Sequence, residues 1–233
     1  MSNQEPNMMV EGVWDDAVAI LGGTGKQGGG LALRWARAGH RVIIGSRSAE
    51  KAVLAAAKLR DVSGRDLFRG MSNAEAVTHV SLAVLTVPYS AHSATLSELK
   101  DALQGKILVD VTVPLRPPQV THVFVPEQGP AAIEAQEILG SGVRVVSALQ
   151  NVSEHSLRDP EEIIECDVLV CGDDAAAKAQ VIELVKALGP ELRAFDAGPL
   201  ANAVVAESLT PILIGLGRQY KRLRVGVRIT GLD

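Results

Sequence analysis

Three glycines at fixed spacing, Gly23, Gly25 and Gly28, are the residues of this 233-residue chain that most directly suggest a chemistry. They follow the apolar run Ala17–Leu21 and precede a helical pattern over residues 29–35. A glycine-rich turn between a strand and a helix brings backbone N–H groups and the positive end of a helix dipole to a pyrophosphate. The spacing therefore predicts a dinucleotide site, and the alternative is a glycine-rich turn without a ligand.

Ser46, Arg47 and Lys51 follow the point where the second strand of such a unit should end. NAD-binding domains usually place Asp or Glu there, because a carboxylate binds the ribose hydroxyls and repels a 2′-phosphate. Residues 42–47 contain no acid, whereas the guanidinium of Arg47, the hydroxyl of Ser46 and the ammonium of Lys51 can all bind phosphate. We therefore expect NADP(H) as the cofactor, with ordinary surface charges as the alternative.

Two segments, 85–89 and 111–114, each follow an apolar run with the sequence Thr-Val-Pro. Ligands of a parallel sheet lie at the carboxyl ends of its strands, so both segments should border the nicotinamide. The alternative is a plain end of a strand, since proline often occurs there.

The histidines do not form a recognisable catalytic set. His40, His79, His92, His122 and His155 are scattered, and they have neither the spacing of a metal site nor a nucleophile elbow beside them. We therefore expect no metal and no acid–base constellation.

The elements that must position these residues are short apolar runs separated by stretches of helical periodicity. The chain is 47% hydrophobic but only 3% aromatic, which is typical of buried parallel strands covered by helices. The fold class is therefore α/β, a Rossmann-type doubly wound parallel sheet. The runs are Ala17–Leu21, Val42–Ile44, Leu82–Thr86, Ile107–Val111 and Val143–Ala148, with a weaker one near Leu67–Arg69.

After Ala148 the pattern changes, which predicts a smaller C-terminal α/β region. We expect a loop over 150–159, strands near 168–171 and 192–195, a helix over 175–188, and a long apolar helix over 200–220 that Pro211 should kink or break. The expected domains are a flexible N-terminal extension (1–15), an NADP-binding Rossmann domain (16–149) and a smaller domain (150–233) that completes a second cleft.

The net charge of −4 gives no long-range attraction for nucleic acid or an anionic membrane, so small molecules are the expected partners. Cys166 and Cys171 are too few for a disulfide framework, and we expect both to be reduced and buried. The N-terminus lacks the features of a signal peptide, and no later run spans a bilayer without charges or helix breakers. We expect a cytoplasmic protein.

Eight segments, in order along nearly the whole chain, resemble the F420-dependent NADP reductases, which pass hydride between NADPH and the 5-deazaflavin coenzyme F420. The first five are shared widely among Rossmann domains, and the last three are far more particular. The segments are Ile20-Leu-Gly-Gly-Thr-Gly25, Gly30-Leu-Ala-Leu33, Gly45-Ser-Arg47, Val84-Leu-Thr-Val-Pro88, Val145-Val-Ser-Ala-Leu149, Val170-Cys-Gly-Asp-Asp174, Asp196-Ala-Gly-Pro-Leu200 and Glu207-Ser-Leu-Thr-Pro211.

The resemblance implies hydride transfer between NADP(H) and coenzyme F420, with catalysis by positioning and no catalytic side chain. It also implies a homodimer packed through C-terminal helices. The deazaflavin would lie over the nicotinamide, beside Gln150, Val152 and Val225. The implied NADP contacts are Thr24, Gly25, Lys26, Gln27, Ser46, Arg47, Lys51, Pro88 and Val113.

The chain departs from the family pattern on the side of the second substrate. Gln150 stands where histidine is frequent, Tyr89 where an indole is common, and the loop 115–119 differs in sequence and length. Gln150 can donate a hydrogen bond to a deazaflavin oxygen but cannot carry charge. The alternatives are an NADPH-dependent reductase of a flavin or another small substrate, and a non-catalytic NADPH sensor. The basic segment 218–224 could bind an anionic tail of the substrate, or its cations could interact with the negative end of a helix dipole.

Overall fold

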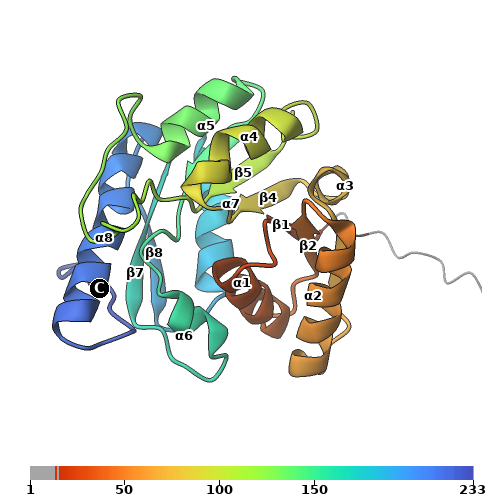
Figure 1. Cartoon of the computed structure of the whole chain (residues 1–233), viewed down its shortest axis with the longest axis horizontal. Coiled ribbons are helices and arrows are strands. Elements are labelled where there is room, and N and C mark those ends of the chain that lie inside the picture. The colour runs from red at the N-terminus through yellow and green to blue at the C-terminus, as the bar shows by residue number, and fades with distance from the viewer. Residues whose placement is uncertain (1–13, 15, 233) are drawn as a thin grey trace, which may run out of the picture.

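The computed structural model describes residues 14 and 16–232, so the expected N-terminal extension lies, apart from Trp14, outside the described residues. Its strands form one eight-stranded sheet (Figure 1). The strands are β1 Val18–Leu21, β2 Val42–Ser46, β3 Phe68–Ser72, β4 Leu82–Leu85, β5 Ile107–Asp110, β6 Arg144–Ser147, β7 Cys166–Gly172 and β8 Leu192–Asp196.

The helices lie on both faces of this sheet, and α2 and α8 lie at opposite sides of the molecule (Figure 1). They are α1 Lys26–Arg37, α2 Ala49–Ser63, α3 Asn73–Thr78, α4 Tyr89–Leu99, α5 Ala131–Leu139, α6 Glu154–Arg158, α7 Ala175–Lys186, the 3₁₀ turn η1 Leu200–Asn202, and α8 Ala203–Gln219.

The strand order β3-β2-β1-β4-β5-β6-β7-β8 confirms the doubly wound Rossmann prediction. Strands β1 to β6 pair in parallel. The weak run near residues 67–69 is a true strand, β3, which pairs with β2 along its full length. Because the order reverses between β1 and β4, the carboxyl ends of these two strands border the crevice where a nucleotide binds in such folds.

The region after residue 150 continues the same sheet. Strand β7 pairs antiparallel with β6 through Val146 with Gly172 and Ser147 with Cys171, and β8 pairs in parallel with β7. The expected domain boundary at residue 150 therefore lies where the chain reverses its direction relative to β6, and as a boundary between domains it stays a prediction.

The core has two layers because successive side chains of a strand point to opposite faces. Val18 and Ile20 of β1 pack in one cluster, with residues of α1, α2 and α7. Ala19 and Leu21 pack in the other, with residues of α3, α4 and α5. Both faces of the sheet are thus buried, as the aliphatic composition predicts.

The first helix is tied to the C-terminal region by polar groups. Arg34, although only 5% exposed, donates to five backbone carbonyl oxygens, and burial lowers the pKa of its guanidinium. Trp35 donates from Nε1 to the carbonyl of Leu184 at 2.8 Å. The acceptors of Arg34 are Ser156, Leu157, Asp159, Glu162 and Leu188.

Helix α8 runs through Pro211 without the expected break. Pro211 is buried and α8 packs against α5, so tertiary contacts offset the lost backbone hydrogen bond. The segment Leu200–Gln219 is long and apolar enough to cross a membrane by length and composition. Helices that pack on a protein core pass the same test, which makes this weak evidence for a span.

Candidate functional site

A cleft of about 930 Å³ opens at the carboxyl ends of β1, β2, β4 and β5. This is the edge at which Rossmann sheets bind nucleotides. All nine residues that the sequence assigns to NADP line this cleft, and so does Gln150. The structure therefore brings the glycine loop, the residues after β2 and the two Thr-Val-Pro segments into one cavity.

The glycine loop is shaped to hold a phosphate against backbone. A side-chain carbon on Gly28 would lie 2.7 Å from both the Cα of Gly23 and Oγ1 of Thr86, so only glycine fits there. Helix α1 begins at Lys26, and no side chain caps its first N–H groups. Free N–H groups at a helix N-terminus are the usual ligands of a pyrophosphate.

The corner after β2 holds the residues expected to bind the 2′-phosphate. Ser46 ends β2, Ser48 caps α2 by accepting from the Lys51 N–H, and Arg47 is exposed between them. The hydroxyl of Ser48 also donates to the carboxylate of Glu50, and this hydrogen bond lowers the pKa of that carboxyl and fixes its position. Within the part of the chain that the structure describes, the cationic groups of Arg47 and Lys51 form no ion pair and remain available to an anion.

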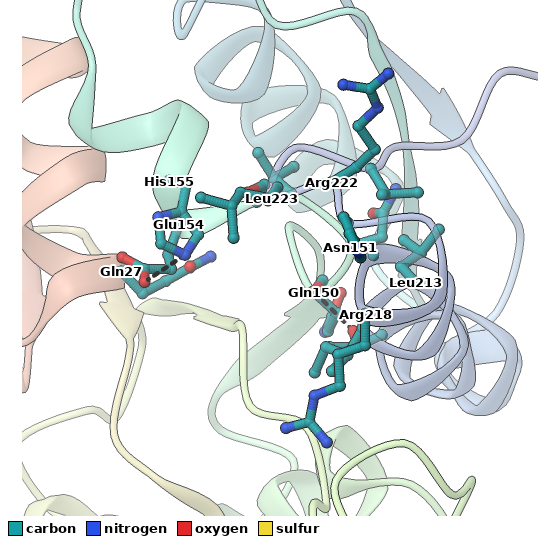
Figure 2. Close-up of a pocket in the computed structure, with 16 residues that line it drawn as sticks. Gln27, Gln150, Asn151, Glu154, His155, Leu213, Arg218, Arg222 and Leu223 are labelled. Carbon is teal, nitrogen blue, oxygen red and sulfur yellow. Dashed lines mark hydrogen bonds and ion pairs between the residues drawn. The ribbon is translucent and has the colours of Figure 1, made fainter.

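A second cleft has a volume of about 650 Å³, and Figure 2 shows the residues that line it. Gln27, Gln150 and Thr210 line both clefts and thus form their shared wall. Val152 and Val225, the other expected substrate residues, line the second cleft only. Its wall is largely apolar, with Leu213, Ile214 and Leu223, and its edge carries Arg218, Lys221 and Arg222.

The side chain of Gln150 is fixed at this wall and only 5% exposed. Its amide nitrogen donates to the carbonyl of Asp110 and to Oγ of Ser147, both at 2.8 Å. Both amide protons are therefore committed within the protein, so a hydrogen bond from Gln150 to a deazaflavin oxygen would require one of these two bonds to break. The oxygen Oε1 is buried and has no partner among the described residues.

Thr86 and Thr112 line the cleft as part of the two Thr-Val-Pro segments expected beside the nicotinamide, although only Pro88 and Val113 of these segments were expected as NADP contacts. Asn73 also lines the cleft and was not foreseen. Its Oδ1 accepts from the N–H of Gly22 at 3.3 Å, across 51 residues of sequence, and no local pattern marks such a bond. Such long-range pairing depends on the strand order.

The sequence gives no sign of a partner for His92, but the structure places Asp110 beside it. Its Nε2 lies 2.7 Å from Oδ2 of Asp110, and both side chains are fully buried. Burial opposes a charge on His92, but the hydrogen bond and negative charge of Asp110 outweigh it and raise the pKa of the imidazole. The pair lies directly below the nucleotide cleft, because the residues after Asp110 line it.

Two carboxyls and a phenol surround this pair. Glu134 lies 3.7 Å from Nδ1 of His92, and Glu207 accepts the N–H groups of Ala131 and Ala132 at the start of α5. Burial raises the pKa of Glu207 to about 8. Tyr89 stacks obliquely on His92, and burial, with a hydrogen bond to Glu134, raises its pKa to about 12. Among the described residues no group of three metal-ligating side chains could hold an ion.

Comparisons with known proteins agree with this geometry. Residues 17–114 match the family model described as NADP oxidoreductase, coenzyme F420-dependent. A solved structure of a protein assigned as an F420-dependent NADP-reductase from Arthrobacter sp. FB24 is 28% identical, with a TM-score of 0.76 over 91% of this chain and 98% of that one.

Two curated relatives are more similar in sequence. The F420-dependent NADP reductase of Methanothermobacter marburgensis is 42% identical over 92% of this chain and 98% of the relative. That of Methanocaldococcus jannaschii is 40% identical over 93% of this chain and 99% of the relative. At this identity, sustained over nearly the full length of both proteins, the chain belongs to the family of F420-dependent NADP reductases.

Proposed function

We propose that this protein transfers hydride between NADPH and coenzyme F420, NADPH in the first cleft and the deazaflavin in the second. The observation that carries the proposal is the shared wall of Gln27, Gln150 and Thr210, where the two clefts meet. NADPH supplies the hydride and the deazaflavin ring accepts it, so the protein has only to place two rings against each other.

The residues of the first cleft fit NADPH. The bare N-terminus of α1 and the glycine loop suit a pyrophosphate, and Arg47 and Lys51 suit the 2′-phosphate. Pro88 and Val113 line the same cleft at the ends of β4 and β5, where they would border the nicotinamide. No acid occupies the end of β2, so no charge there repels the phosphate.

The second cleft fits a flat conjugated ring with an anionic substituent. Val152, Leu213 and Val225 provide an apolar wall, and the exposed cations at residues 218–222 lie at its edge. Those cations would bind phosphate or carboxylate groups outside the ring. A ring packed against this apolar wall would keep water away from the transferred hydride.

Isotope transfer tests the proposal directly. NADPH deuterated at C4 should reduce coenzyme F420 in the presence of the protein, with loss of deazaflavin absorbance and retention of deuterium in the product. Turnover of FMN but not of F420 would favour the flavin reductase instead. NADPH binding without turnover of any acceptor would indicate a sensor.

We further propose a cytoplasmic homodimer with small molecules as its other partners. Helix α8 exposes an apolar stripe in which Val205 is 54%, Ile212 48% and Leu216 38% exposed. Both cysteines are free, which suits a reducing compartment. Light scattering should show a dimer, and Ile212→Lys should dissociate it. Ile163→Lys, at an exposed residue outside α8, is the control and should leave the dimer intact. A monomeric wild-type protein would refute the dimer.

A further inference from the structure

The buried pair His92–Asp110 has no part in the function as described so far. An ion pair in a protein interior rarely stabilises the fold more than apolar side chains of the same size would. Among the described residues, three polar atoms around Asp110 are buried without a hydrogen-bond partner: Nδ1 of His92, Oγ1 of Thr112 and Oε1 of Gln150. Unsatisfied buried groups cost free energy, so this cluster calls for an explanation other than stability.

Asp110 connects the ends of two neighbouring strands. It is the last residue of β5, and its Oδ1 accepts the N–H of Thr112 at 2.9 Å, which fixes the chain where it enters the nucleotide cleft. Its carbonyl accepts Nε2 of Gln150 at 2.8 Å and the N–H of Ala148 at 3.3 Å. His92 holds the remaining oxygen, Oδ2, from helix α4.

We propose that His92 and Asp110 are positioning residues for hydride transfer, because together they fix the ends of β5 and β6 so that the two clefts open onto each other at Gln150. The inference rests on the proposed function. Neither side chain lines either cleft, so they act through Thr112 and Gln150 and not on a ligand.

The charge state of His92 should matter to this arrangement. Groups from four elements face it: Asp110 of β5, Glu134 of α5, Glu207 of α8 and Tyr89 of its own helix. A protonated imidazole carries a proton on Nδ1 toward Glu134, whereas a neutral one that donates from Nε2 presents a lone pair there. Deprotonation thus replaces attraction by repulsion and loosens the hold on Asp110.

Two substitutions separate the positions of the ring nitrogens. The amide nitrogen in His92→Gln occupies roughly the place of Nε2 and can still donate to Asp110, whereas in His92→Asn it lies near the place of Nδ1 and cannot. Leu96→Ala, at a fully buried position of the same helix, is the control for lost stability, and His79→Asn, at an exposed site, is the control for the substitution itself.

Single-turnover transfer from NADPH should fall about ten-fold or more in His92→Asn, since small misplacements of reacting groups have large effects on rate. NADPH affinity should stay within about two-fold in both variants, because the phosphate contacts are distant. The wild-type rate should decline as pH rises through the raised pKa of His92. His92→Gln should keep most of the rate and should not show this decline. The proposal would be overturned if His92→Asn transferred hydride as fast as the wild type. It would also be overturned if His92→Asn lost no more rate than Leu96→Ala at an equal loss of stability.

A measurement without any acceptor keeps this test apart from the proposed function. The side-chain amide resonances of Gln150, observed by NMR in the ligand-free protein, should shift with pH in the wild type and should shift by less in His92→Gln, where Glu207 still titrates but position 92 does not. Resonances in His92→Asn that match the wild type at every pH would refute the coupling, whatever the protein's substrate. Coupled resonances with no F420 turnover would instead refute only the proposed function.

Discussion

Thr210 donates its hydroxyl to the carbonyl oxygen of Gln150 at 2.8 Å and thereby ties helix α8 to the end of β6. The two residues are 60 apart in sequence, and both belong to the wall between the clefts. The second cleft thus depends on α8 for one side and on the end of β6 for the other.

Thr210→Val should loosen that wall while conserving side-chain shape. Loss of one partly buried hydrogen bond should lower the free energy of unfolding by about 1 kcal/mol. F420 turnover (kcat/KM) should fall several-fold more than NADPH affinity, because the bond orders the second cleft. Thr78→Val removes a comparable hydroxyl-to-carbonyl bond on α3 and is the matched control. Equal losses in both variants would exclude a role for the bond at the site.

Arg47→Ala should weaken NADPH binding and leave NADH binding nearly unchanged. A charge-assisted bond to phosphate contributes about 2 kcal/mol, which corresponds to a change of about thirty-fold in affinity. Nucleotide titrations monitored by fluorescence would measure both constants. Arg60→Ala, later on the same helix α2, should alter neither. If NADH and NADPH weaken alike, Arg47 does not bind the 2′-phosphate.

Gly28→Ala should disrupt the phosphate loop, and its neighbour provides the control. The added carbon would lie 2.7 Å from the Cα of Gly23, a backbone atom that cannot move without opening the loop. At Gly29 nothing lies within 4 Å, so Gly29→Ala should stabilise α1 by up to about 1 kcal/mol. NADPH affinity should collapse only in Gly28→Ala, and tight binding by that variant would refute the assigned geometry.

Asp167 should make the fold sensitive to acid. This buried carboxylate accepts bonds from Arg193, Arg228 and the N–H of Ile229, and the bond from Arg193 is the main reason that its pKa is lowered to about 2. A lowered pKa stabilises the folded state above the unfolded pKa, and that stability is lost as pH falls through the folded value. The group should account for about 2 kcal/mol of unfolding free energy between about pH 4 and about pH 2.

Denaturant unfolding at several acidic pH values would check this. The variant Asp167→Asn should be less stable than the wild type at neutral pH and should lose less stability on acidification. Asp101→Asn, at an exposed residue, should follow the wild-type curve. Parallel curves for the wild type and Asp167→Asn would contradict the assignment.

Local sequence patterns predicted much of the fold and of the nucleotide cleft, because both depend on short-range features. The glycine spacing, the missing acid after β2 and the aliphatic runs are each contained within a few residues. The single sheet was harder to foresee, since β7 pairs with β6 in the opposite direction and no local pattern records which edge a strand joins. Of the two outcomes expected at Pro211, a kink or a break, the break does not occur, because the packing of α8 overrides the local rule.

The pair His92–Asp110 shows a different limit. Its members are 18 residues apart, on α4 and β5, and their contact exists only because that helix packs over that strand end. Gln150 was predicted to bind the second substrate, but the sequence could not show that its amide nitrogen already donates to Ser147 and to the Asp110 carbonyl.

The bonds of Arg34 bear on how the chain is made. Its guanidinium reaches carbonyl oxygens as far along as Leu188, 154 residues later, and Trp35 reaches Leu184. A nascent chain that has emerged only as far as residue 150 lacks every one of these acceptors. The guanidinium of Arg34 on its first helix could then be buried only without hydrogen-bond partners, which costs free energy. We expect the nucleotide-binding half to remain incompletely folded on the ribosome and to fold together with the rest of the protein, in one step.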